Sequence, residues 1–126
     1  MNMETHYARA HELQAQGRHG DAAAIYKALV DQAEDPRFCI AYGECLQHLG
    51  HWRQSAKFLQ RGIDLKPACC EGDARLMLAE SLLHLGLKDK AIAQWRIVAA
   101  MPPAYPSHEA VPDEARRKLR EHSRRS

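Results

Sequence analysis

A glycine recurs in this chain at a nearly constant interval, at Gly17, Gly50 and Gly86. The first two are 33 residues apart and the last two are 36 residues apart, which brackets the period of about 34 residues that helix–turn–helix repeats have. Such repeats stack on their neighbours, bury a shared core and leave a curved groove along one side. The interval therefore predicts a single domain over residues 1–126, with repeats at about 4–35, 36–69 and 72–103.

The helix expected after each glycine has the same stripe of residues, at offsets i, i+4, i+7 and i+8, which lie on one face of a helix. The stripe residues are Ala22, Tyr26, Leu29 and Val30, then Ser55, Leu59, Gly62 and Ile63, then Ala91, Trp95, Val98 and Ala99. With the leading helices included, we expect helices at about 4–16, 20–33, 36–49, 52–65, 73–85 and 88–100. The fold class is all-α, a right-handed α-solenoid. Because glycine within a helix costs about 1 kcal/mol relative to alanine, we predict a close helix–helix contact at Gly62.

Local signals mark the ends of these helices. Asp35 followed by Pro36 is a capping residue before a proline in the first helical position, and Pro67 ends the fourth helix. The proline-rich stretch 101–106 cannot continue a helix, and no fourth repeat follows it. We predict a capping helix at about 112–123, with Asp113 in the first turn, where it suits the helix dipole. Whether the segment at Tyr105 packs on the solenoid end or serves as a ligand stays open.

Composition excludes several classes of function. A formal net charge of +2 is close to neutral, so no strong attraction to nucleic acid or to an acidic membrane surface is implied. No apolar run approaches the roughly 20 residues that a membrane span needs, and the first residues lack the pattern of a signal peptide. We therefore expect a cytoplasmic protein without a membrane partner.

The end of the chain is basic, with a net charge of +3 over residues 113–126. Its cations are Arg116, Arg117, Lys118, Arg120, Arg124 and Arg125. They could neutralise phosphates, but no aromatic residue lies among them to stack on bases. We therefore favour a solvated capping helix that packs through Ala115 and Leu119. Binding of nucleic acid by the basic end is the less favoured interpretation.

The four cysteines, Cys39, Cys45, Cys69 and Cys70, include no C-x-x-C pair. Their spacing suits neither a zinc site nor a disulfide framework. We expect reduced thiols, with Cys39 and Cys45 packed on one helix as small apolar residues.

The strings GRHGDAAAIYKALV, GHWRQSAKFLQRGIDLKP and GLKDKAIAQWRIVAAMPP resemble the second halves of tetratricopeptide repeats. The second copy matches best, with Gly43, Gly50, Trp52 and Pro67 at the family's positions for glycine, glycine, an aromatic residue and proline. It departs from the family at Ser55 and Gly62, where alanine is usual, and no proline follows the first repeat. The resemblance covers about residues 4–103 and concerns the fold more than the function.

The resemblance implies a groove lined by the first helix of each repeat. The groove-facing positions that we expect to bind a partner are Tyr7, His11, Gln14, Arg37, Ile40, Glu44, Gln47, His48, Asp73, Leu76, Met77, Glu80, Leu83 and His84, with Glu4 and Ala41 beside them. This set mixes apolar anchors with groups that form hydrogen bonds, so it suits a peptide or a helix of another protein. The implied function is a non-catalytic interaction module, an adaptor or a chaperone. A secretion chaperone that holds an unfolded client is one concrete version. The oligomeric state is left open.

An alternative function is a metal- or small-ligand-binding protein that uses Glu44 and His48 with the equivalent Glu80 and His84. Imidazole and carboxylate are good ligands for zinc. However, equivalent positions in neighbouring repeats lie about 8–10 Å apart, and each helix supplies only two ligands, so we expect no metal and no cofactor. No nucleophile motif, phosphate loop or H-E-x-x-H motif is present, and we expect no enzymatic activity.

Overall fold

The computed structural model describes residues 2–102 and 110–123, and within these ranges the chain forms seven helices and no strand. They are α1 (Met3–Ala15), α2 (His19–Gln32), α3 (Pro36–His48), α4 (Trp52–Asp64), α5 (Glu71–His84), α6 (Lys88–Ala99) and α7 (Ala110–Ser123). Each begins and ends within two residues of the bounds expected from the sequence. The all-α solenoid is therefore confirmed.

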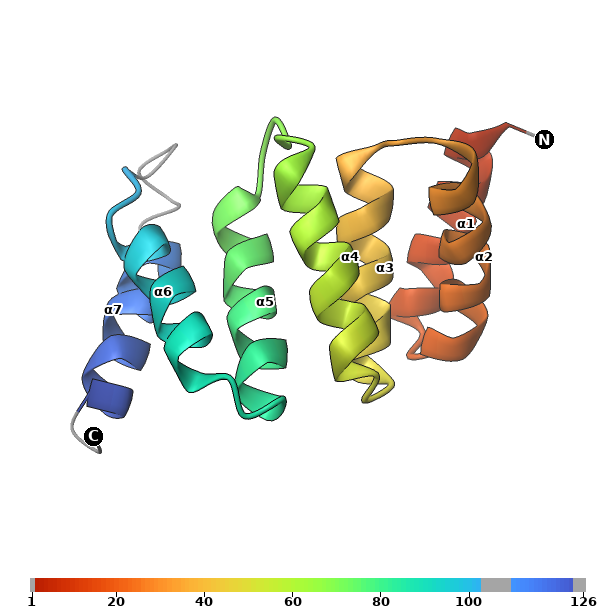
Figure 1. Cartoon of the computed structure of the whole chain (residues 1–126). Coiled ribbons are helices and arrows are strands. Elements are labelled where there is room, and N and C mark those ends of the chain that lie inside the picture. Colours follow the sequence, from red (N-terminus) through yellow and green to blue (C-terminus); the bar gives the residue numbers. More distant parts are fainter. Residues whose placement is uncertain (1, 103–109, 124–126) are drawn as a thin grey trace.

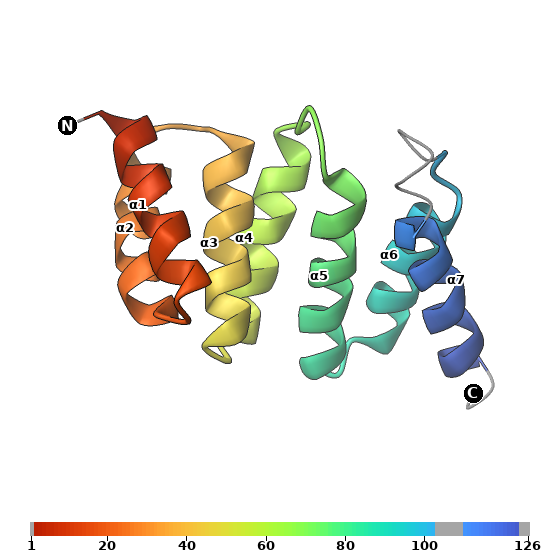
Figure 2. The ribbon, with the colours of Figure 1, turned by 180° about the vertical axis from the view of Figure 1, so that it is seen from behind.

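The helices form antiparallel pairs that follow one another along the solenoid (Figure 1). Seen from behind, α1, α3, α5 and α7 make up the near layer and α2, α4 and α6 the far layer (Figure 2). We call the surface of α1, α3 and α5 the first-helix face, and the surface of α2, α4 and α6 the second-helix face. None of the described helices is long and apolar enough to cross a membrane.

The repeated glycine ends the first helix of each pair. Gly17, Gly50 and Gly86 all have φ of +78°, a left-handed conformation that costs a residue with a side chain about 1–2 kcal/mol. The residue after each glycine closes the turn with a backbone hydrogen bond. After Gly17, the Arg18 amide donates to the Leu13 carbonyl at 2.9 Å, and equivalent bonds of the same length follow the other two glycines. This pattern is the Schellman cap, and it explains why glycine is the residue that repeats.

Asp35 caps α3 as the sequence predicted, because its Oδ1 accepts from the Arg37 amide at 2.9 Å and Pro36 is the first helical residue. The close contact predicted at Gly62 is also present. A Cβ there would lie 2.7 Å from Ile40 Cγ1 and 3.2 Å from Cys39 Cβ. Only a residue without a side chain allows α4 to approach α3 so closely.

The core runs along the solenoid as three clusters of buried side chains. One joins the first pair to α3 and contains Tyr26 and Phe38. A second lies between the second and third pairs around Leu59 and Leu78. The third contains Trp95 and extends to Ala115 of α7. Cys39 and Cys45 are fully buried in the first cluster, and burial raises the pKa of Cys45 to about 12, so both pack as expected.

α7 covers the last pair, and it begins at Ala110, two residues before the expected start. Ala115 is fully buried against the third cluster, and Arg116 Nη2 donates to the Ala99 carbonyl at 3.1 Å. Of the basic end, Arg116 and Arg117 pair with carboxylates on the same helix. Arg124 and Arg125 lie outside the described residues, as does the segment at Tyr105.

Candidate functional site

An aromatic group occupies the first-helix face at the N-terminal end. The half-buried Tyr7 ring lies 5.3 Å from the Phe38 ring and meets the His11 ring edge-on at 4.6 Å. The Arg37 guanidinium lies 5.1 Å from the centre of the Tyr7 ring, within the range of a cation–π contact. Burial raises the pKa of Tyr7, so its phenol stays neutral at physiological pH. This part of the face offers an apolar ring with a hydroxyl at its tip.

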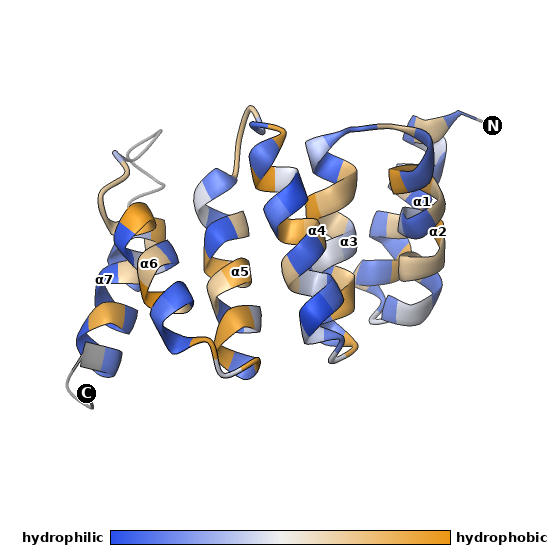
Figure 3. Ribbon diagram, viewed as in Figure 1, coloured by the Kyte–Doolittle hydropathy of each residue, from blue (hydrophilic) through white to orange (hydrophobic). Residues whose placement is uncertain are grey.

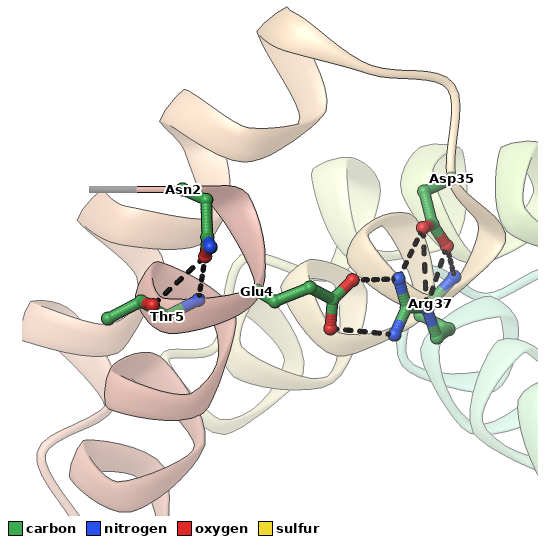
Figure 4. Close-up of polar contacts among 5 residues, drawn as sticks. All are labelled: Asn2, Glu4, Thr5, Asp35 and Arg37. Carbon is green, nitrogen blue, oxygen red and sulfur yellow. Dashed lines mark hydrogen bonds and ion pairs between the residues drawn. The ribbon is translucent and has the colours of Figure 1, made fainter.

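Arg37 joins the first two pairs through carboxylates on either side (Figure 4). Its guanidinium donates to both oxygens of Glu4, at 2.6 and 3.2 Å, and to Asp35 Oδ2 at 2.7 Å. The hydrogen bond to Arg37 is the main cause that lowers the pKa of each carboxyl, Glu4 and Asp35. The arginine is therefore held in place before any partner arrives.

These lowered pKa values predict a pH dependence of stability. A carboxyl whose pKa is lower in the folded state contributes stability above its ordinary pKa, and this contribution is lost as the pH falls through the lowered value. The ordinary values here are 4.5 and 3.8. We expect the difference in free energy of unfolding between wild type and Arg37→Met, measured by urea unfolding, to be constant above about pH 5.5 and to shrink below about pH 4.5.

The matched control for this pH series is Arg96→Met, because Arg96 is an exposed arginine without an ion pair in the described part of the chain. The difference in free energy of unfolding between Arg96→Met and wild type should not change with pH over the same range. If the same difference for Arg37→Met stays constant down to about pH 2.5, the assigned ion pairs are wrong.

Three of the polar residues that are expected to contact a partner form hydrogen bonds between neighbouring repeats. Gln14 donates to Glu44 and accepts from the Tyr26 hydroxyl at 2.9 Å. Gln47 Nε2 donates to the Met77 carbonyl at 2.7 Å and to Ser81 Oγ at 2.8 Å. The amide hydrogens of Gln47 are thus used within the fold.

The buried serines complete this polar network, a role that was not predicted from the sequence. Ser55 Oγ donates to the Gly43 carbonyl at 2.8 Å, and Ser81 Oγ donates to Ser55 Oγ at 3.0 Å. Both serines are fully buried, so each hydroxyl needs a partner. The signal in the sequence was Ser55 itself, a hydroxyl where the repeat pattern favours alanine.

The two groove histidines face the preceding repeat. His48 stacks on His19 with ring centres 4.2 Å apart, and His84 stacks on Trp52 at 3.8 Å. Glu80 lies 3.3 Å from His84, while Glu44 accepts from Gln14. No group of three or more His, Cys, Asp or Glu that could hold a metal occurs among residues 2–102 and 110–123.

Half-buried apolar side chains cross the first-helix face from α1 to α5. Ile40 and Met77 pack against the cluster around Leu59, while Leu76 and Leu83 pack against the cluster that α7 completes. Together with Tyr7 they form what we call the apolar strip. His11 and Asp73 are exposed on the same helices, so the strip is bordered by polar groups.

Similar folds occur among solved structures. PcrH in complex with the chaperone binding region of PopD is 28% identical with a TM-score of 0.88, and covers 97% of this chain and 91% of that chain. PcrH in complex with the chaperone binding region of PopB is 29% identical with a TM-score of 0.83, over 93% and 94% of the two chains. The Yersinia enterocolitica type III secretion translocator chaperone SycD is 22% identical with a TM-score of 0.85, over 94% and 81%. These are tetratricopeptide-like helical folds.

Comparison of the sequence with family models and with curated proteins finds no match. The likeness therefore rests on the arrangement of helices and on the identity to the PcrH chains.

Proposed function

We propose that this chain is a chaperone or adaptor that holds a segment of a partner protein on its first-helix face. The observation that carries the proposal is the apolar strip of Tyr7, Ile40, Leu76, Met77 and Leu83, half-buried side chains on the first helices of three successive pairs. Two PcrH structures, 28% and 29% identical to this chain, are complexes with the chaperone binding regions of PopD and PopB. Both support a client segment as the ligand.

The strip suits a segment that places apolar side chains at intervals along its length. An extended peptide or one face of an amphipathic helix meets that requirement. Because Gln14 and Gln47 are bonded within the fold, we assign the orientation of the segment to Arg37, His11, Asp73 and the Glu80–His84 pair. The ion pairs that hold Arg37 reduce the entropy lost on binding.

Two expectations from the sequence belong to this proposal. We propose that binding is non-catalytic, since the Glu80–His84 pair is exposed on an open surface where water screens its charges. We also propose that the protein acts in the cytoplasm.

The proposal is tested by site-specific photocrosslinking in the native cell. A photoreactive amino acid is placed at His11 or Asp73 on the first-helix face, and at Lys27 or Ile97 on the second-helix face as controls; all four positions are exposed. We expect one protein to be crosslinked from the first two positions and not from the last two. Crosslinks to that protein from the control positions alone would overturn the proposal.

Once the crosslinked segment is known, Tyr7→Ala is expected to weaken its binding about tenfold or more, as the loss of a central aromatic anchor does. The matched control is Phe58→Ala, which truncates a half-buried aromatic ring on α4 that contacts Tyr42 at 4.7 Å. Titration calorimetry at a temperature where both variants are folded measures the affinities. If the two variants weaken binding of the segment equally, the loss of affinity in Tyr7→Ala comes from reduced stability of the protein and not from a lost contact with the client.

A further inference from the structure

A groove of about 570 Å³ lies on the second-helix face, away from the apolar strip. Its floor is formed by Leu78 and Leu82 of α5 and by Leu85 directly after that helix, and its walls by α4 and α6. Given 3.6 residues per turn, these leucines lie on the side of α5 opposite to Leu76 and Leu83. Figure 3 shows hydrophobic turns of α5 beside α4 and α6, on which hydrophilic and hydrophobic residues alternate.

The walls of this groove carry one sign of charge. Arg53 and Lys57 come from α4 and Lys90 from α6, and the lining contains no aspartate or glutamate. In the described part of the chain none of the three has a carboxylate oxygen within 4 Å, whereas Arg18 and Arg75, for example, are paired. The net charge of the whole chain is only +2, so this positive potential is local.

Each of the two glutamines in the walls uses one end of its amide within the fold. Gln60 Nε2 donates to Asp64 at 2.9 Å, and Gln94 Oε1 accepts from Arg75 at 2.8 Å. An extended strand entering the groove would need a partner for each of its backbone groups, more than the other ends of two amides supply. A helix satisfies its backbone internally and presents only side chains to the groove.

We propose that this groove binds an acidic amphipathic helix of a partner protein. The three leucines of the floor are spaced i, i+4 and i+7 along α5 and its C-cap, as suits an apolar stripe of a second helix. Glutamates or aspartates on both flanks of that helix would lie against Arg53 and Lys57 on one side and Lys90 on the other. This site is separate from the first-helix face and does not depend on the function proposed for it.

The test uses a fluorescein-labelled synthetic helix of about 14 residues, four turns, with leucines on one face and glutamates on both flanks. A second peptide has lysines in place of the glutamates. Fluorescence anisotropy with the full-length protein measures both affinities. We expect the acidic peptide to bind at least about tenfold more tightly than the basic one, with an advantage that falls as salt is added.

Two double variants identify the site. Lys57→Glu with Lys90→Glu reverses one charge on each wall, while Lys27→Glu with Arg96→Glu makes the same change in net charge at exposed positions outside the groove. We expect the first to weaken binding of the acidic peptide about tenfold or more and the second to leave it nearly unchanged. Circular dichroism establishes that both variants are folded.

Equal binding of the two peptides, binding of neither, or equal weakening by the two double variants would overturn the proposal. Sedimentation of the wild type and of Lys57→Glu with Lys90→Glu tests for a different occupant. If only the wild type self-associates, the groove is filled by a second copy of this chain and the proposed acidic partner is wrong.

Discussion

Replacing Trp95 by alanine is expected to lower the free energy of unfolding by about 3–5 kcal/mol, the range for truncating a buried aromatic residue. Trp95 is 1% exposed, and it is the largest side chain in the cluster that joins α5, α6 and α7. Its ring also lies 4.8 Å from the His122 ring on α7. The cavity would therefore loosen the capping helix from the last repeat as well as the repeat itself.

Urea unfolding followed by far-ultraviolet circular dichroism measures this effect without relying on tryptophan fluorescence. Ile97→Ala is the control, because Ile97 lies on the same helix and is 42% exposed, and a change of no more than about 0.5 kcal/mol is expected there. A loss below about 1 kcal/mol for Trp95→Ala would mean that the third cluster does not have the packing described here.

Gly43→Ala is expected to destabilise the protein by about 1–2 kcal/mol even though alanine favours a helix. A Cβ at Gly43 would lie 2.6 Å from Leu59 Cγ and 3.2 Å from the Leu59 backbone nitrogen. Since Leu59 is fully buried, α3 and α4 would have to separate. That movement would also weaken the bond from Ser55 to the Gly43 carbonyl, which is 2.8 Å long.

The control for Gly43→Ala is the same substitution at Gly20, a helical glycine with no atom within 4 Å of the added Cβ. Gly20→Ala should stabilise the protein, by about 0.5 kcal/mol. Thermal or urea unfolding of both variants thus tests for effects of opposite sign. Stabilisation by both would show that the α3–α4 contact has room for a methyl group.

The two proposed binding surfaces lie on opposite sides of α5. Leu76 and Leu83 belong to the apolar strip, while Leu78, Leu82 and Leu85 form the floor of the second groove. A client on one side and an acidic helix on the other would therefore not compete for the same residues.

The helices were predicted to within two residues because their signals are local. The turn at Gly50 depends on a left-handed residue, and the stripe of Leu59 and Ile63 depends on the helical period alone. The contact at Gly62 also followed from the sequence, because a glycine in a helix has a cost that a close approach offsets. The residues of the apolar strip, such as Tyr7, Ile40 and Met77, were instead expected from the resemblance to tetratricopeptide repeats, which places a groove along the first helices.

The partners of the polar side chains could not be predicted in this way. Gln47 reaches Ser81, His48 stacks on His19, and Arg37 binds Glu4, and each of these contacts joins different repeats. They depend on the rotation and distance between helix pairs, which no local pattern specifies. The basic groove was missed for the same reason, because Lys57 and Lys90 become neighbours of one cavity only when α4 and α6 both pack on α5.

The sequence by itself therefore determined the helices of the described residues, the turns at the repeated glycines and the buried stripes of α2, α4 and α6, since these follow from backbone conformation and helical period. The tertiary structure decided which polar groups remain free for a partner. Hydrogen bonds and ring stacking act only over a few ångströms, so a difference of a few degrees between repeats determines whether a side chain binds its neighbour or faces solvent.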